Sequence, residues 1–305
     1  MNRREFSRNL AMGAVGAGTL GAAARAAGAR PAVRAGEAGG PGQGIPFKLS
    51  VMLWTVFGKL PFEQRLENVA SAGYGNVELV GEFREWSDQD YANVKSTRRR
   101  LGIQFDATAG VSKSLTDPKD REAFLHEVAG MLPVMEKLEC PALIVLTGDT
   151  VPGVSHEAQH ASCVEGLKRA ADLVQGRGVR VLVENIDPEE NPKYFLTSVS
   201  EGFEIVKEVD HPQVRFLYDF YHEQISEGNL IEKLEKNIGL VDLVHIADVP
   251  GRHQPGTGEI NYANIYKKLV ELGYDRYAAM EFLPVGDPVQ ELKAARALAL
   301  HSGPV

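Results

Sequence analysis

Residues 180–185 read RVLVEN, a short apolar run with β-branched side chains that is typical of a strand buried on both faces. Seven further runs share this character: KLSVMLW (48–54), NVELVG (76–81), IQFDAT (103–108), ALIVLTG (142–148), VRFLYDF (214–220), VDLVHIAD (241–248) and YAAMEFL (277–283). Longer stretches with helical spacing of apolar residues lie between them. Helical crossovers between buried strands predict a parallel sheet. Eight such units in about 250 residues predict an α/β fold, a closed (β/α)8 TIM barrel in a single domain.

An open, doubly wound sheet is the alternative architecture for alternating strands and helices. Such a sheet more often carries a glycine fingerprint after its first strand, and MLWTVFGK (52–59) has none. The stretch PFEQRLENVASAG (61–73) shows the expected helix pattern: a proline opens it, a glycine ends it, and Phe62, Leu66 and Val69 share one face. The sequence therefore favours the closed barrel.

The first residues have the features of a twin-arginine export signal. Arg3 and Arg4 precede an apolar, small-residue stretch at 10–24, and a small-x-small pattern ends at Ala29. The apolar stretch is too short and too glycine-rich to span a bilayer, so no stable membrane anchor is expected. We predict that residues 1–29 are a cleaved signal and that the mature protein is periplasmic or otherwise extracytoplasmic.

The rest of the chain divides into a linker and the barrel. Residues 30–46 (RPAVRAGEAGGPGQGIP) contain almost nothing to bury and predict a flexible linker, so the barrel is expected to occupy residues 47–305. Two cysteines, Cys140 and Cys163, make neither a disulfide framework nor a thiolate metal site. Both are expected to be buried in the core.

The charge of the chain argues against nucleic-acid binding. The formal net charge is −8, and removal of residues 1–29, which contain four arginines and one glutamate, lowers it to −11. Such a chain repels phosphates unless it has a segregated basic face. The basic run RRR at 98–100 lies in a helical pattern and is expected to be a solvated face of that helix.

Four consecutive predicted strands carry a carboxylate or an imidazole near their ends. These residues are Glu184, Asp219, His245 and Glu281. Each one alone is explained by a salt bridge, a helix cap or a core histidine. Together at the C-terminal mouth of a barrel they would repel one another and lose solvation unless paired, and a divalent cation removes that cost. Carboxylates with one imidazole suit a single Mg, Mn, Co or Zn ion.

Residues that flank this set are expected to contact a substrate. His222 lies three residues past Asp219, in the expected loop after the strand, and Arg252 lies in the loop after His245, where a planar cation can bind an oxyanion or carboxylate. Glu78 and Trp54 also occupy predicted strand ends. Ordinary loop chemistry and barrel packing are the alternative explanations for these side chains.

The segments VELVGEF (77–83), VENIDPEENPKYFL (183–196), LYDFYHEQISEGNL (217–230) and HIADVPGRHQPGTGEINY (245–262) resemble the hydroxypyruvate isomerase family. This family belongs to the xylose isomerase-like barrels, together with ketose 3-epimerases and endonuclease IV, and the resemblance covers residues 47–300. It implies one divalent metal ion held by Glu184, Asp219, His245 and Glu281. It also implies that Glu184 and Glu281 are the acid–base pair and that His222 and Arg252 contact the substrate.

The resemblance implies a metal-dependent isomerase that interconverts a small hydroxy-ketone and aldehyde through an enediolate. Ketose 3-epimerisation is the first alternative, because ketose epimerases carry a histidine, and hydroxypyruvate isomerases a glutamine, at the position of His245. A non-catalytic, exported sugar-binding barrel is the second. A three-zinc nuclease is the third, but Gly251 stands where the aspartate that would partner His253 is expected. The expected ligand is a small sugar or 2-keto acid, and homo-oligomerisation is left open.

Overall fold

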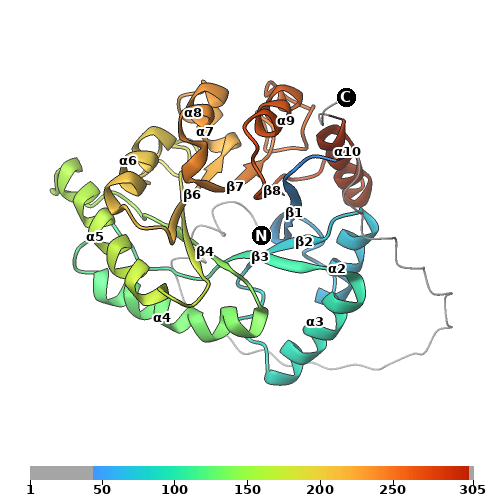
Figure 1. The fold of residues 1–305 in the computed structure, drawn as a ribbon, viewed down its shortest axis with the longest axis horizontal. Helices are drawn as coiled ribbons and strands as arrows, with labels where there is room; N and C mark the ends of the chain where they lie inside the picture. The colour runs from blue at the N-terminus through green and yellow to red at the C-terminus, as the bar shows by residue number, and fades with distance from the viewer. Residues whose placement is uncertain (1–43, 302–305) are drawn as a thin grey trace.

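The computed structural model describes residues 44–301, and its eight strands close into a barrel in which every neighbouring pair is parallel. The strands follow one another around the ring in chain order (Figure 1). Their bounds are β1 (Lys48–Met52), β2 (Asn76–Val80), β3 (Gln104–Ala109), β4 (Ala142–Leu146), β5 (Arg180–Glu184), β6 (Val214–Asp219), β7 (Val241–Ile246) and β8 (Tyr277–Met280). The predicted (β/α)8 barrel is confirmed.

The helices form the outer layer around this barrel (Figure 1). They are α2 (Phe62–Ser71), α3 (Asp88–Leu101), α4 (Arg121–Leu138), α5 (His156–Val174), α6 (Val199–Val209), α7 (Phe220–Ser226), α8 (Leu230–Asn237), α9 (Tyr262–Glu271) and α10 (Pro288–Leu300). Two helices, α7 and α8, follow β6, where the sequence pattern predicted one. The extra helix α7 begins directly after β6 because the side chain of Asp219 accepts hydrogen bonds from the first backbone N–H groups of the helix.

Apolar side chains pack in two separate layers, one inside the barrel and one between barrel and helices. The inner layer consists of small and medium side chains, namely Met52, Ala107, Ala142, Ile144, Leu182, Leu217, Leu243 and Ala279. The outer layer is much larger and includes both cysteines, which are free and buried as expected. Because these side chains fill the interior of the barrel, a ligand can bind only at a mouth of the barrel and not inside it.

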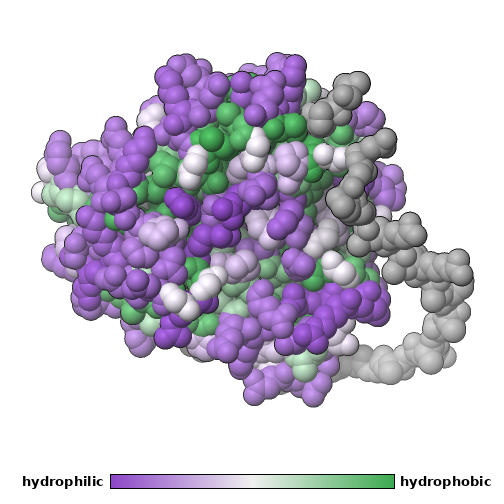
Figure 2. All heavy atoms as spheres, viewed as in Figure 1, coloured by the Kyte–Doolittle hydropathy of each residue, from purple (hydrophilic) through white to green (hydrophobic). Residues whose placement is uncertain are grey.

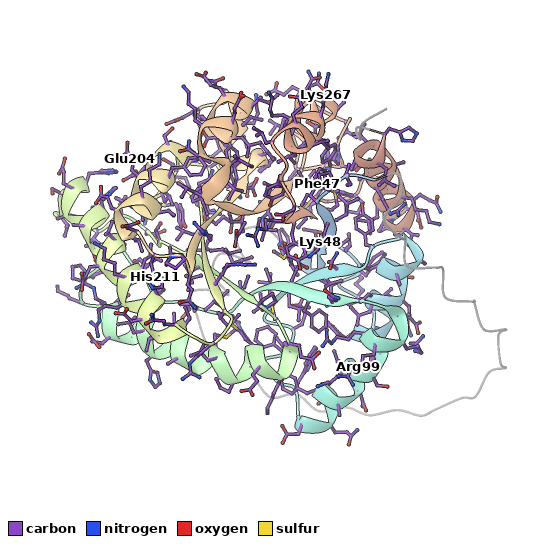
Figure 3. The ribbon with its side chains drawn as sticks, in the orientation of Figure 1. Phe47, Lys48, Arg99, Glu204, His211 and Lys267 are labelled. Atoms are coloured by element: carbon purple, nitrogen blue, oxygen red, sulfur yellow. The ribbon has the colours of Figure 1, made fainter. Side chains whose placement is uncertain are left out.

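The surface follows the helical pattern of the sequence. Arg99 on α3, Glu204 on α6 and Lys267 on α9 are exposed and point away from the barrel (Figure 3). Hydrophilic residues cover the outer helices of the face in Figure 2, and hydrophobic ones show mainly between them. The expectation that all three arginines at 98–100 are solvated is wrong. Arg98 is buried, lies over the Phe105 ring and pairs with the Glu139 carboxylate.

The predicted export signal at 1–29 and nearly all of the predicted linker at 30–46 lie outside the described residues. Among residues 44–301, none of the helices combines the length and the apolar character needed to cross a bilayer.

Candidate active site

Four neighbouring strands each direct one ligand-type side chain into the barrel interior. Alternate residues of a strand face the same side. The four side chains therefore each lie two positions beyond an interior apolar residue: Glu184 after Leu182, Asp219 after Leu217, His245 after Leu243 and Glu281 after Ala279. All four are buried, and each offers an atom that lies within 4.8 Å of those of the other three. The structure thus brings together the set read from the strand ends.

The imidazole of His245 is oriented so that one nitrogen faces the carboxylates. Its Nδ1 lies 2.8 Å from Glu281 Oε2, 3.2 Å from Glu184 Oε1 and 3.7 Å from Asp219 Oδ2. Within residues 44–301 this nitrogen has no hydrogen-bond partner, although it is buried. A buried, unbonded nitrogen among three carboxylates fits a metal ligand, because a cation would satisfy all four groups at once.

Glu78 fixes that orientation from the other side of the ring. His245 Nε2 lies 2.9 Å from Glu78 Oε2, so the Nε2–H can donate to this carboxylate oxygen. The Nε2–H tautomer leaves the Nδ1 lone pair free for a cation, the arrangement in which metal-binding histidines are usually held. Glu78 was expected at a strand end facing substrate. It instead lies in the middle of β2, is fully buried and is not among the residues that line the cavity.

A second buried acid lies beside Glu78. Burial and the charge of Glu78 raise the pKa of Asp106 well above its usual range, and Ser50 donates to Asp106 Oδ1 at 2.7 Å. Burial beside Glu78 thus favours the protonated form of Asp106, which avoids two adjacent buried charges.

The two glutamates that line the cavity have different electrostatic surroundings. Burial raises the pKa of Glu184, and the nearby His245 only partly offsets it. Burial alone would also raise the pKa of Glu281, but the charges of Arg252 and His245 outweigh it and hold that pKa below its ordinary value. Two carboxyl groups with oppositely shifted pKa values can take different roles in proton transfer.

Arg252 is fixed over the carboxylates by its loop and by two aromatic rings. Its Nη2 lies 2.6 Å from Glu281 Oε2, and its Nη1 donates to Glu190 Oε2 at 3.2 Å. The guanidinium carbon lies 5.6 Å from the Trp54 ring centroid and 5.0 Å from that of Tyr221. A buried, always-charged fork in this position can orient an anionic or hydroxylated ligand.

The loop that carries Arg252 is built around the side chain of Asp248. This carboxylate accepts hydrogen bonds from the backbone N–H groups of Gly256, Gly258 and Ile260. A Cβ at Gly258 would lie 2.0 Å from the Val249 carbonyl oxygen, so only glycine fits there. The glycines of this loop therefore allow the backbone to fold around Asp248, and Arg252 is the side chain that the loop places in the cavity.

His222 lies on α7 rather than in a loop. Its Nδ1 contacts Asp187 Oδ2 at 2.6 Å, and its Nε2 lies 3.5 Å from Asp219 Oδ2 at the edge of the cavity. Asp187 Oδ1 accepts from the backbone N–H groups of Glu189 and Glu190. Asp187, Glu190 and His222 form a second group with ligand-type spacing, but Asp187 is occupied on both oxygens and Arg252 already neutralises Glu190. Asp187 is thus a positioning residue for His222.

Trp54 lines the cavity and also holds one of the four ligand-type side chains. Its Nε1–H donates to Glu281 Oε1 at 2.9 Å, so the indole holds the carboxylate that Arg252 holds from the other oxygen. Sequence reasoning missed Asp187 and Glu190. Both lie in the loop after β5, within the stretch VENIDPEEN (183–191) that also contains Glu184, and this density of carboxylates was the available signal.

A cavity of about 540 Å³ opens above the four-residue set. Glu184, Glu281, His222, Arg252, Glu190 and Trp54 line it. The side chains that can move protons and those that can bind oxygen atoms therefore face one space.

Several known proteins are similar to this chain in sequence. A family model described as xylose isomerase-like TIM barrel matches residues 66–299. A 2-oxo-tetronate isomerase from Haemophilus influenzae is 31% identical over 250 residues, which cover 80% of this chain and 96% of that protein. A hydroxypyruvate isomerase from Escherichia coli is 28% identical over 245 residues, with 78% and 93% covered.

A solved structure gives the same fold. The crystal structure of a Brucella melitensis protein described as an AP endonuclease of family 2 superposes with a TM-score of 0.73 at 28% identity, and the match covers 81% of this chain and 96% of that one.

Proposed function

The chain belongs to the xylose isomerase-like TIM barrel family, and on that premise we propose that it is a divalent metal-dependent isomerase of a small hydroxy-carbonyl compound. Its named relatives are isomerases, as the sequence resemblance implied. The observation that carries the proposal is the placement of two buried glutamates with different pKa shifts in one cavity, beside a histidine nitrogen directed at both.

Glu184, Asp219, His245 and Glu281 would hold the ion, with Nδ1 as the histidine ligand. A bound divalent cation would act as a Lewis acid and stabilise the negative charge that develops when the carbon next to a carbonyl loses a proton. The remaining chemistry belongs to side chains of this protein. Arg252 and His222 face the cavity as donors for substrate oxygens, and Trp54 keeps the Glu281 carboxylate in place.

Proton transfer between two carbon positions requires one group that accepts a proton and one that returns it. Glu281, whose pKa is lowered, is ionised, whereas Glu184, whose pKa is raised, can carry a proton. Return of the proton to the adjacent carbon gives aldose–ketose isomerisation. Return to the opposite face of the same carbon gives epimerisation.

Ketose 3-epimerisation is the second candidate, and the observation that favours it is the ligand His245 itself. The sequence resemblance associates histidine at this position with ketose epimerases and glutamine with hydroxypyruvate isomerases. The two reactions share the first proton transfer and the same residues. They differ only in where the proton returns, so product analysis separates them.

Two other readings fit the geometry less well. A trinuclear nuclease would use His253, but His253 Nδ1 contacts the Leu283 carbonyl oxygen at 2.8 Å and takes no part in the ligand-type groups found in residues 44–301. The net charge of −8 also opposes binding of a polyanion. A sugar-binding barrel without activity would not need two buried carboxylates paired in one cavity.

The test is incorporation of deuterium from solvent into a panel of sugars and 2-keto acids, followed by NMR. We expect exchange that requires one metal ion per chain, counted by mass spectrometry. Glu184→Gln and Glu281→Gln should each lower turnover by about 10²–10⁴-fold, the usual contribution of general acid–base catalysis, while the folded circular dichroism spectrum is retained. A variant with near-normal turnover would remove that residue from the mechanism.

A further inference from the structure

The barrel interior contains a buried carboxyl group, that of Asp106, that neither binds the proposed ion nor moves a proton. Asp106 lies in β3, is 2% exposed and is not among the residues that line the cavity. It belongs to a chain of polar contacts with Ser50, Glu78 and His245, and these four side chains are called here the polar column. Burial of a carboxyl group is costly unless the group is bonded, so its place in the column points to a role.

An irregularity in β3 turns Asp106 into the column. Glu78 and the residue before it are consecutive in β2, but they pair with Ala107 and Phe105 of β3. Asp106 is therefore an extra residue of its strand, a β-bulge. Bulges of this kind re-aim a side chain and are common beside active sites. Here the bulge lets Asp106 share the interior with its neighbour Ala107, which belongs to the inner apolar layer.

Two oxygens of the polar column lack a donor. Glu78 Oε1 and Asp106 Oδ2 are buried and have no hydrogen-bond partner among residues 44–301. The other oxygen of Asp106 accepts from Ser50 Oγ at 2.7 Å. The other oxygen of Glu78 lies 2.9 Å from His245 Nε2. Both carboxyl groups therefore have one bonded and one unbonded oxygen.

A single proton satisfies both unbonded oxygens. The side chains of Glu78 and Asp106 lie within hydrogen-bonding reach of each other. Two carboxylates can only accept, whereas a protonated carboxyl group donates one O–H. Burial, and next the charge of Glu78, favour the proton on Asp106. Asp106 then donates from Oδ2 to Glu78 Oε1 and still accepts from Ser50 on Oδ1.

This hydrogen bond would hold the Glu78 carboxylate from both oxygens. Rotation about the last bond of the side chain would break the contact with Asp106 as well as the contact with His245. A fixed acceptor keeps the imidazole in the orientation in which Nδ1 faces the carboxylates of the site. Partners that orient a ligating histidine set the affinity for the metal.

We propose that Asp106 is a positioning residue for the metal ligand His245 and that it acts by donating a hydrogen bond to Glu78. The inference rests on the proposed function, because it takes His245 as a ligand of the ion. A merely structural role would lower the stability of the fold alone. A positioning role lowers the affinity for the metal, and it does so only while Glu78 is present.

The first test measures the metal Kd of a matched pair of variants by competition with a fluorescent chelator. Asp106→Asn keeps a donor for Glu78 and an acceptor for Ser50, so its Kd should stay within about twofold of the wild type. Asp106→Leu keeps the branched shape but has neither group. Its Kd should rise about tenfold, the lower end of the range for partners of ligating residues, because Asp106 acts through Glu78. Asp106→Ala, which adds no bulk, should give the same result if the leucine variant does not fold.

Two controls separate positioning from loss of stability. Thr108→Val removes another buried hydroxyl of β3, which donates to the Leu79 carbonyl oxygen, and should leave the metal Kd unchanged even if the Tm falls. Glu78→Met keeps the length of the side chain but has no carboxylate. In that background Asp106→Leu should change the Kd by less than about twofold, because the two residues act as one unit.

Infrared spectroscopy tests the hydrogen bond without metal or turnover. At neutral pH the wild-type protein should show the band of a protonated aspartic carboxyl group, shifted by ¹³C-labelling of aspartate and absent in Asp106→Asn. Absence of the band from the wild type would overturn the proposal. Equal metal Kd values for Asp106→Leu and the wild type, or an equal loss in both Glu78 backgrounds, would also overturn it. A wild-type protein that binds no divalent ion would instead refute the proposed function.

Discussion

Replacement of Glu78 by glutamine should weaken metal binding without removing any metal ligand. The Glu78 carboxylate accepts from His245 Nε2 at 2.9 Å, and the two side chains are only 0% and 1% exposed. Glutamine keeps the size of the side chain and one acceptor but loses the negative charge. It can also present its amide N–H₂ to the ring, which favours the tautomer that carries the proton on Nδ1 and blocks the ligand position.

The expected loss follows from the role of Glu78 as the group that orients a ligand. Removal of such a partner typically lowers metal affinity by 10–100-fold, about 1.4–2.7 kcal/mol. Competition with a fluorescent chelator at fixed pH measures the metal Kd of Glu78→Gln. With saturating metal, turnover should return to within about tenfold of the wild type, because the glutamates that move protons are intact.

A matched substitution separates this effect from general loss of charge. Glu67→Gln removes one carboxylate from the exposed face of α2, and its metal Kd should equal that of the wild type. If Glu78→Gln binds metal as tightly as Glu67→Gln, the histidine is not held as a ligand by Glu78.

Three further predictions concern protonation, the arginine and the loop. Burial alone would lower the pKa of His245, but the charges of Glu281 and Glu78 raise it well above its ordinary value, so a metal ion must displace a proton from this side chain. The affinity for the metal should therefore rise with pH by up to about tenfold per pH unit. Calorimetry in buffers of different ionisation enthalpy should show that a proton is released on metal binding. Arg252→Lys should lower kcat/KM by roughly 10–100-fold in steady-state assays, because lysine lacks the fork that bonds two groups; an unchanged value would exclude substrate contact. Gly258→Ala should destabilise the fold by about 1–3 kcal/mol in thermal melts, because the new Cβ meets a backbone oxygen at 2.0 Å. Gly130→Ala, with open space on α4, should instead match or exceed the wild-type Tm.

The sequence was sufficient for the barrel and for the four residues that converge in it, because both follow from local patterns. Each strand is a continuous apolar run, and each candidate ligand interrupts such a run near its end. The role of Glu78 was not predictable in the same way. It depends on the contact between β2 and β7, which are not neighbours in the ring. Arg98 was misjudged for a similar reason, since its partner Glu139 lies beyond the next helix and strand.

The positions of Asp187 and Glu190 show the other limit of sequence reasoning. Both lie in a loop. Loops lack the regular repeat of side-chain direction that strands and helices have, so the sequence does not predict where these side chains point. The structure shows that Asp187 orients His222 and that Glu190 pairs with Arg252. These contacts join segments more than 30 residues apart, and only the closed ring brings them together.

The barrel separates two tasks between its halves. Strands β5 to β8 supply Glu184, Asp219, His245 and Glu281, and their places are fixed by strand alternation and by buried partners. The segments after β3 and β4 supply the other wall of the cavity, and they contribute none of these four groups. Substitutions in the second wall can therefore change the length and polarity of the ligand without disturbing proton transfer.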